Sequence, residues 1–308
     1  MSDVIKIKVP ASTANLGPGF DTLSLALDWY NEFTFKLSND TFKNLQINQI
    51  NSNKLPEDST NLVYKAFCEP YKKLKKTVPH VEIDINCQIP LAAGLGSSAS
   101  AVVSGLLAAN HFLSNQLTKE EILSLATKIE GHPDNVAAGL YGGLTISVSY
   151  DEKVYISKFP WPRELLVIVV LPDFELPTRI SRELLPVNVS YSDATFNVSR
   201  TAYLLSCLLN KDWNGLKIGF QDRLHQPYRK DLVPGMEMVL NEGLSAGAFG
   251  ATLSGAGPTL VAFVNDKEKA GFIGKKMTDK WKEFNVKSTY KILNVAFDAT
   301  KIESLVVK

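Results

Sequence analysis

The stretch PLAAGLGSSASA (residues 90–101) places two glycines and two serines directly before a run of small residues. A helix N-terminus has unpaired N–H groups and about half a unit of positive charge, so it binds anions when the preceding loop allows close approach. Gly94 and Gly96 permit that approach and a positive φ. The same residues also suit a tight turn before a close-packed helix, and both interpretations remain open at this point.

This stretch is not a Walker P-loop, because that pattern requires a lysine after the last glycine and none follows Gly96. It also fails the dinucleotide-binding fingerprint. A phosphate site without the lysine needs another source of positive charge, and we expect a divalent cation.

Glu130 is a candidate ligand for such a cation. It is expected in the last turn of a helix, just before Gly131 at the position that ends the helix. A carboxylate there opposes the helix dipole by roughly 0.3–1 kcal/mol. It is either a solvated, mildly unfavourable side chain or a carboxylate retained to bind a cation, and HPDN (residues 132–135) follows at once.

Two further segments carry polar and basic side chains that could recognise a small molecule. PASTANLGPGFDTL (residues 10–23) is longer than a simple hairpin requires and contains Asn15 and Asp21. TRISRELLP places Thr178 and Arg182 four residues apart, on one face of a helix start. Both segments have a plain alternative, a connecting loop for the first and a solvated helix face for the second.

Two arginines in DRLHQPYRKDLVPG extend the basic character of the second half. Arg223 and Arg229 each carry a planar, permanently charged guanidinium, which suits bidentate capture of a carboxylate. Taken alone, each arginine fits a surface position equally well. LSGAGPT (residues 253–259) adds a second glycine turn, which a tight hairpin would also explain.

The elements that must position these residues alternate between strands and helices. In the first half we expect strands over residues 5–9 (ended by Pro10), 23–37, 45–50, 81–89 and 142–150, and helices over 61–69, 98–113 and 118–130. In the second half we expect strands over 165–172, 250–253, 259–264 and 290–297, and helices over 180–185, 193–210, 235–247 and 267–284. The proline-rich FPWPREL is the candidate boundary between domains 1–160 and 161–308. The pattern predicts an α+β protein with two lobes.

Composition excludes several classes of partner. The 308 residues have a formal net charge of +1, so we expect no nucleic acid and no membrane as partner. Three cysteines at wide spacings argue against a disulfide framework or a zinc site and fit a reducing compartment. No signal peptide is recognisable at the start, so a cytoplasmic protein is expected.

PASTANLGPGFDTLSLAL, PLAAGLGSSASA and LSGAGPT together resemble the three signature motifs of the GHMP small-molecule kinases, in the family's order. EGHPDNVAAGLYGG, PTRISRELLP and HQPYRKDLVPG resemble the branch that phosphorylates homoserine. The resemblance implies a first lobe similar to domain 2 of ribosomal protein S5 and a second, ferredoxin-like lobe. It also implies transfer of the ATP γ-phosphoryl group to the hydroxyl of L-homoserine, in threonine biosynthesis, and a homodimer.

The resemblance also assigns residues. It places ATP on Asn61, Leu91, Ala92, Ala93, Gly94, Leu95, Gly96, Ser97, Ser98, Ala99, Ser100 and Ala101. It implies that Ser98 and Glu130 bind Mg²⁺. It implies that homoserine is bound by Asn15, Asp21, His132, Asn135, Thr178, Arg182 and Arg229, and that the two arginines bind its carboxylate. Asp21 and Asn135 would be catalytic by orienting the hydroxyl for direct attack on the γ-phosphorus.

Two rival functions are left open. One is another GHMP kinase that acts on mevalonate, a sugar or a related alcohol. The other is a non-catalytic member that senses a ligand on the same fold. The intact glycine loop with Ser98 and Glu130 argues against the second, since a pure binder has no need of a metal site.

Overall fold

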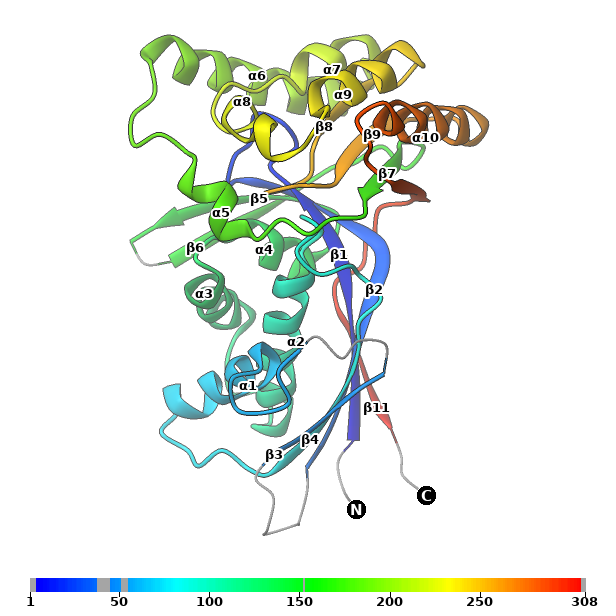
Figure 1. Ribbon diagram of the computed structural model, residues 1–308. Helices are drawn as coiled ribbons and strands as arrows, with labels where there is room; N and C mark the ends of the chain where they lie inside the picture. The colour runs from blue at the N-terminus through cyan, green and yellow to red at the C-terminus, as the bar shows by residue number, and fades with distance from the viewer. Residues whose placement is uncertain (1–3, 38–44, 51–54, 152, 306–308) are drawn as a thin grey trace.

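The computed structural model describes residues 4–37, 45–50, 55–151 and 153–305. Two β-sheets, each covered by helices, form two lobes that meet in the middle of the molecule (Figure 1). The expected α+β architecture is confirmed.

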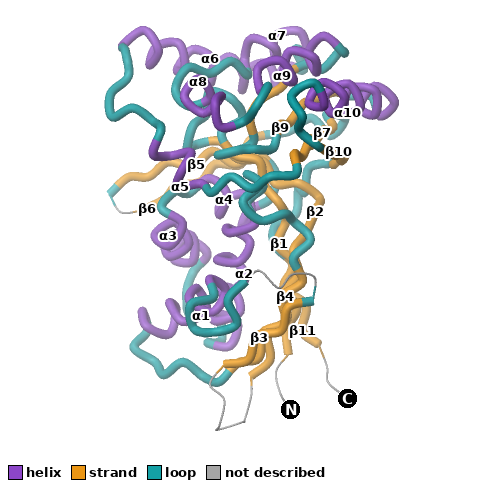
Figure 2. Tube along the Cα trace, in the orientation of Figure 1, coloured by secondary structure: helices purple, strands orange, loops and turns teal. Residues whose placement is uncertain are grey.

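The first lobe consists of a seven-stranded sheet with helices packed on one face (Figure 2). Its elements are β1 (Val4–Ala14), β2 (Leu23–Leu37), β3 (Leu45–Gln49), α1 (Leu62–Lys73), β4 (Val81–Asn86), α2 (Ser97–Phe112), α3 (Lys119–Glu130), α4 (Asp134–Tyr141), β5 (Leu144–Tyr150), β6 (Lys153–Phe159) and β11 (Lys301–Leu305). The strand order is β11-β1-β2-β4-β3, and β5 pairs with β2 and with β6. The core between sheet and helices includes Phe33, Phe35 and Phe67, all fully buried.

The second lobe has a four-stranded antiparallel sheet, in the order β10-β7-β9-β8. Its elements are β7 (Leu166–Pro172), α5 (Thr178–Glu183), α6 (Tyr191–Asn210), α7 (Trp213–Gly219), α8 (Gln226–Arg229), η1 (Lys230–Leu232), α9 (Met236–Ser245), β8 (Gly250–Leu253), β9 (Leu260–Val264), α10 (Lys267–Lys282) and β10 (Ser288–Leu293). The outer strands of this sheet are β10 and β8, the fourth and the second strand of the lobe in chain order. Helices lie between β7 and β8 and between β9 and β10 in the chain. This is the ferredoxin-like arrangement.

Two proline positions differ from the sequence expectation. The first strand was expected to end at Pro10, but β1 continues to Ala14. The register between β1 and β2 shifts between Pro10 and Ala11, so a bulge accommodates the residue that lacks an N–H. Pro70 lies inside α1, which runs on to Lys73.

Several elements were not expected from the sequence, namely α4, β6, α7, α8, η1 and β11. The last of these changes the connectivity, because β11 returns to the first lobe and pairs antiparallel with β1. On the way, Asn294 donates two hydrogen bonds to Asp28, and Val295 forms a bridge to Leu27 in β2. The chain therefore crosses between the lobes twice, once after β6 and once after β10. The domain boundary near residue 160 stays a prediction.

Two absences expected from the sequence can be compared with the described residues. Cys68, Cys87 and Cys207 are all free thiols, as the wide spacing predicts. None of the helices in the described ranges combines the length and the apolar character needed to cross a bilayer.

Candidate active site

A cavity of about 310 Å³ lies where the two lobes meet, and it collects most of the residues singled out in the sequence. The expected site residues that line it are Asn15, Asp21, Ala92, Ala93, Gly94, Leu95, Gly96, Ser97, Ser98, Ala99, Glu130, His132, Asn135, Thr178, Arg182 and Arg229. They come from both lobes. One cavity thus joins the glycine loop, the candidate metal ligands and the polar residues expected to hold a small molecule.

The glycine loop ends where α2 begins. Gly96 caps this helix in the left-handed conformation, with φ at 69°, and Ser97 and Ser98 form its first turn. Residues of that turn line the cavity, so the positive end of the helix dipole faces it. The position suits an anionic group of a ligand.

The two glycines have a packing reason in addition to their backbone angles. A Cβ on Gly94 would lie 2.3 Å from the carbonyl oxygen of Ser254, and a Cβ on Gly96 would lie 2.1 Å from Oγ of Ser12. Ser254 belongs to the second glycine turn, and its hydroxyl donates to the carbonyl of Gly94. The three glycine-bearing motifs therefore pack directly on one another. The expected positive φ is confirmed for Gly94, at 73°, and for Gly96.

Ser98 and Glu130 face each other at the end of the cavity next to the first turn of α2. The Ser98 hydroxyl donates to Oε1 of Glu130 over 2.6 Å. Glu130 is the last residue of α3, and Gly131 ends the helix at φ 84°, as expected. Burial raises the pKa of Glu130 above its ordinary value, against the hydrogen bond from Ser98 that lowers it. A carboxylate that burial disfavours, beside a hydroxyl in a cavity, is a donor set that fits a hard cation such as Mg²⁺.

Asp21 and Arg182 form a bidentate ion pair on the other side of the cavity. Nη1 and Nη2 of Arg182 donate to the two carboxylate oxygens over 3.0 and 2.6 Å. Burial lowers the pKa of Arg182, but the hydrogen bond and charge of Asp21 outweigh it, so the pKa is raised. The backbone N–H of Asp21 donates to Oδ1 of Asn15, which fixes the loop that carries both residues. Both are in the left-handed region, with φ at 53° and 70°.

His132, Asp134 and Asn135 form a connected group at the start of α4. Nδ1 of His132 lies 2.5 Å from Oδ1 of Asp134, and the same oxygen accepts from the backbone N–H of Asn135. Burial lowers the pKa of His132, whereas the hydrogen bond and charge of Asp134 raise it, and the net direction is upward. Oδ1 of Asn135 accepts from the hydroxyl of Ser12, so its side chain is held in place.

Of the two candidate arginines, only Arg229 lines the cavity. It is 1% exposed, and burial followed by the charge of Arg182 lowers its pKa to about 10. Arg223 instead pairs with Asp193 at 3.5 Å and stacks over Phe196. The role of Arg229 toward a ligand stays a prediction.

Four expected nucleotide residues do not line this cavity. Asn61 is buried, caps α1 through Val63 and donates to the carbonyl of Pro56. Leu91 lines a neighbouring cavity of about 610 Å³. Ser100 donates to the carbonyl of Ser97 within α2, and Ala101 is in the next turn. Their roles toward ATP stay predictions.

Sequence reasoning missed other residues at the cavity. Asp134 lies in the quoted HPDN but was given no role, although it binds both His132 and Asn135. Together with Asp21 and His132 it forms a group whose ligand atoms lie within 4.8 Å of one another. Phe20, in the expected substrate loop, also lines the cavity. The signal available for Phe20 was its place directly after the glycines of GPGF, and for Asp134 only its place in the quoted HPDN.

Comparison with known proteins agrees with these features. Residues 61–143 match the family model of the GHMP kinases N terminal domain, and residues 204–283 match that of the GHMP kinases C terminal domain. The homoserine kinase of Crocosphaera subtropica is 41% identical over 293 residues, which cover 94% of this chain and 95% of that protein. The homoserine kinase of Halothermothrix orenii is 41% identical over 286 residues, 92% and 91% of the two chains.

Solved structures show the same relationship. The crystal structure of homoserine kinase from Cytophaga hutchinsonii has a TM-score of 0.89 and 32% identity, over 98% of each chain. A mevalonate kinase from L. major, in complex with R-mevalonate, has a TM-score of 0.72 at 19% identity over 96% of each chain, and shows the fold alone. The chain therefore belongs to the GHMP kinase family, in its homoserine kinase branch.

Proposed function

We propose that this chain transfers the γ-phosphoryl group of ATP to the side-chain hydroxyl of L-homoserine, yielding O-phospho-L-homoserine for threonine biosynthesis. The observation that carries the proposal is one cavity with a helix N-terminus at one end and an opposed pair of fixed charges at the other. A phosphate donor and a zwitterionic acceptor therefore both have complementary groups within it.

The charges at the acceptor end match those of an amino acid. Arg182 and Arg229 offer guanidinium groups to the carboxylate of homoserine. Asp21 and His132 offer an anionic oxygen and a ring nitrogen to its amino group. In the structure Asp21 and Arg182 pair with each other. In the proposed complex the amino group of homoserine takes the place of Arg182 at Asp21, and its carboxylate takes the place of Asp21 at Arg182. Asn15 and Thr178 complete the binding site in this proposal.

At the donor end, residues 91–101 would hold ATP, with the triphosphate against the first turn of α2. Ser98 and Glu130 would hold Mg²⁺, whose contribution when bound is to neutralise charge on the phosphate oxygens. The support for this assignment is that the first turn of α2 and the Ser98–Glu130 pair line the same cavity.

In the proposed reaction the homoserine hydroxyl attacks the γ-phosphorus in line, the bond from phosphorus to the bridging oxygen of ADP breaks, and the hydroxyl proton is released to solvent. Phosphoryl transfer through a loose transition state depends on positioning more than on proton removal. Asn135, held by Ser12, and Asp21, held by Asn15, are the catalytic residues that orient the hydroxyl. No general base is assigned.

The proposal is tested by measuring ADP release with L-homoserine, mevalonate and galactose as separate acceptors. We expect turnover with homoserine at least tenfold above the others, roughly what one unpaired charged group contributes. Preference for mevalonate or galactose would assign the chain to another kinase activity. ATP binding without turnover on any acceptor would favour a ligand sensor. The homodimer implied by the resemblance stays a prediction for sedimentation analysis.

A further inference from the structure

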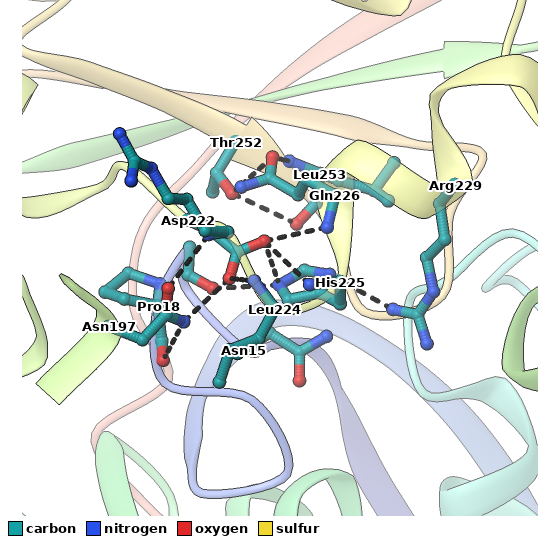
Figure 3. A network of polar contacts seen from close by, with 12 residues as sticks. Asn15, Pro18, Asn197, Asp222, Leu224, His225, Gln226, Arg229, Thr252 and Leu253 are labelled. Carbon is teal, nitrogen blue, oxygen red and sulfur yellow. Dashed lines mark hydrogen bonds and ion pairs between the residues drawn. The ribbon is translucent and has the colours of Figure 1, made fainter. Parts of the chain in front are cut away.

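Behind Arg229 lies a buried polar network that no step of the proposed reaction uses (Figure 3). His225 and the side chain of Asp222 are fully buried, and both come from the turn that precedes α8. Nη1 of Arg229 donates to Nδ1 of His225 over 3.2 Å and to the carbonyl of Gly255 over 3.0 Å. Burying polar groups is costly unless they are hydrogen-bonded, and a fully hydrogen-bonded buried network makes the residues that it joins rigid.

The hydrogen bonds define the state of the His225 ring. An arginine has only donors, so Nδ1 of His225 must accept from it. The proton of a neutral imidazole is then on Nε2, which lies 2.8 Å from the carbonyl oxygen of Gly17 and donates to it. A protonated ring would place two donors against each other at Arg229. Burial lowers the pKa of His225, which agrees with the neutral ring.

Asp222 fixes the backbone that carries this ring. Its Oδ2 accepts from the backbone N–H groups of His225 and Gln226 over 3.0 and 2.7 Å, at the start of α8. Its Oδ1 accepts from the side-chain amide of Asn197, which also donates to the carbonyl of Pro18. The network therefore ties α6 and α8 to the loop that carries Asp21.

Three of the N–H groups of Arg229 are committed to the protein. Nε donates to the carbonyl of Ser181, and Nη1 has the two bonds to His225 and Gly255. Within the described ranges no hydrogen bond is found for Nη2. In Figure 3 one terminal nitrogen of the guanidinium reaches His225 and the other points away from the network.

We infer that His225, supported by Asp222, is a positioning residue that fixes the Arg229 guanidinium so that Nη2 meets the carboxylate of the acceptor. The inference rests on the proposed function for the identity of that carboxylate. It predicts that homoserine affinity depends on the acceptor at Nδ1 and not on the donor at Nε2.

Two substitutions separate the two ring nitrogens. His225→Asn keeps an oxygen near the place of Nδ1, so it retains an acceptor for Arg229 and loses the donor to Gly17. His225→Gln keeps an amide N–H near the place of Nε2 and loses the acceptor. Both lose the ring that stacks on Phe20. We expect His225→Gln to raise the KM for homoserine by about tenfold, the effect of one charge-assisted hydrogen bond, and His225→Asn by less than about threefold.

The KM for ATP is expected to change by less than about twofold in both variants, and His111→Gln, on α2 away from the cavity, serves as the matched control. Homoserine amide, which lacks the carboxylate charge, should show no further loss in His225→Gln. If both variants raise the homoserine KM equally, or neither raises it, the inference is wrong.

Should His225→Asn fail to fold, His225→Gln is tested in an Arg229→Lys background. An undiminished effect of His225→Gln on the homoserine KM in that background would overturn the inference. Absence of wild-type turnover would instead refute the proposed function.

Discussion

The donor end of the cavity comes mainly from one run of chain, residues 92–99, with Glu130 added from the end of α3, whereas the acceptor end is assembled from separate segments in both lobes. The donor end uses backbone and small side chains at the start of α2. The acceptor end uses long charged side chains, each held by a second residue, as Asp21 holds Arg182 and His225 holds Arg229. The first can be recognised from local sequence, while the second exists only once the chain has folded.

The strongest test of this contrast is Glu130, the single carboxylate at the donor end that we assign to a metal. Glu130→Gln should lower kcat by about 10²–10³-fold, in the range for loss of a preorganised charge, and should raise the Mg²⁺ concentration needed for turnover. Steady-state kinetics across a Mg²⁺ titration measures both. Glu120→Gln, in the first turn of the same helix, should leave both unchanged. An unaltered Mg²⁺ dependence in Glu130→Gln would exclude it as a ligand.

Gly94→Ala tests whether the donor end is set by packing between glycine motifs. The new Cβ would overlap the carbonyl of Ser254, and φ is positive, so we expect a loss of about 2–4 kcal/mol in the free energy of unfolding. Urea denaturation measures it. At Gly131 the φ is also positive, but no atom lies within 4 Å of an added Cβ. Gly131→Ala should therefore lower the free energy of unfolding by only about 1–2 kcal/mol. Equal losses would show that the contact with Ser254 has no effect.

Asp21→Asn tests the acceptor end. Because the carboxylate is assigned to the amino group of the substrate and to Arg182, we expect the KM for homoserine to rise by about 10–100-fold. The KM for ATP should stay within about twofold. Arg179→Gln, which breaks the exposed pair with Glu183 on α5, is the control and should change neither. A near-normal homoserine KM and kcat in Asp21→Asn would remove this residue from the site.

The smallest expected effect concerns pH and the network behind Arg229. The pKa of His225 is lowered in the folded protein, so the unfolded chain takes up the proton first as pH falls below 6.5. The folded state binds fewer protons there, and the free energy of unfolding decreases with falling pH. His225→Asn and His225→Gln should both flatten this dependence, by at most about 1.4 kcal/mol per pH unit. Urea denaturation over a pH series measures it, and His111→Gln should retain the wild-type slope.

Helices and strands could be predicted from the sequence where a cap or a hydrophobic periodicity within the segment itself marks them. The helix expected from residue 118 begins there, with a capping box between Thr118 and Glu121, and β2 has the expected bounds. The strand β11 was missed because KIESL is short, polar and exposed along its whole length, so it has no hydrophobic alternation to detect. The helix α8 spans only four residues and depends on Asp222 for its start.

The site divides in the same way. The missing lysine and the unfavourable helix end are visible in the sequence and singled out a cation and Glu130, and the family resemblance then paired Ser98 with Glu130. His225 and Asp222 have no such signal. A buried histidine and a surface histidine differ only in what surrounds them, and here the surroundings come from α6, the loop after β1 and the second glycine turn. Secondary-structure propensity and hydrophobic periodicity are local properties, so they do not reveal contacts between segments this far apart in the sequence.

The return of the chain to the first sheet has a mechanical consequence. The second lobe is an insertion between β6 and β11, and the second crossing is itself hydrogen-bonded to β2 through Asn294 and Ala296. A domain joined by one linker can swing about a single hinge, whereas any rotation here must bend both connections at once. Substrate entry is therefore expected to depend on local exchange of side-chain partners, such as the release of Arg182 from Asp21, more than on opening of the lobes.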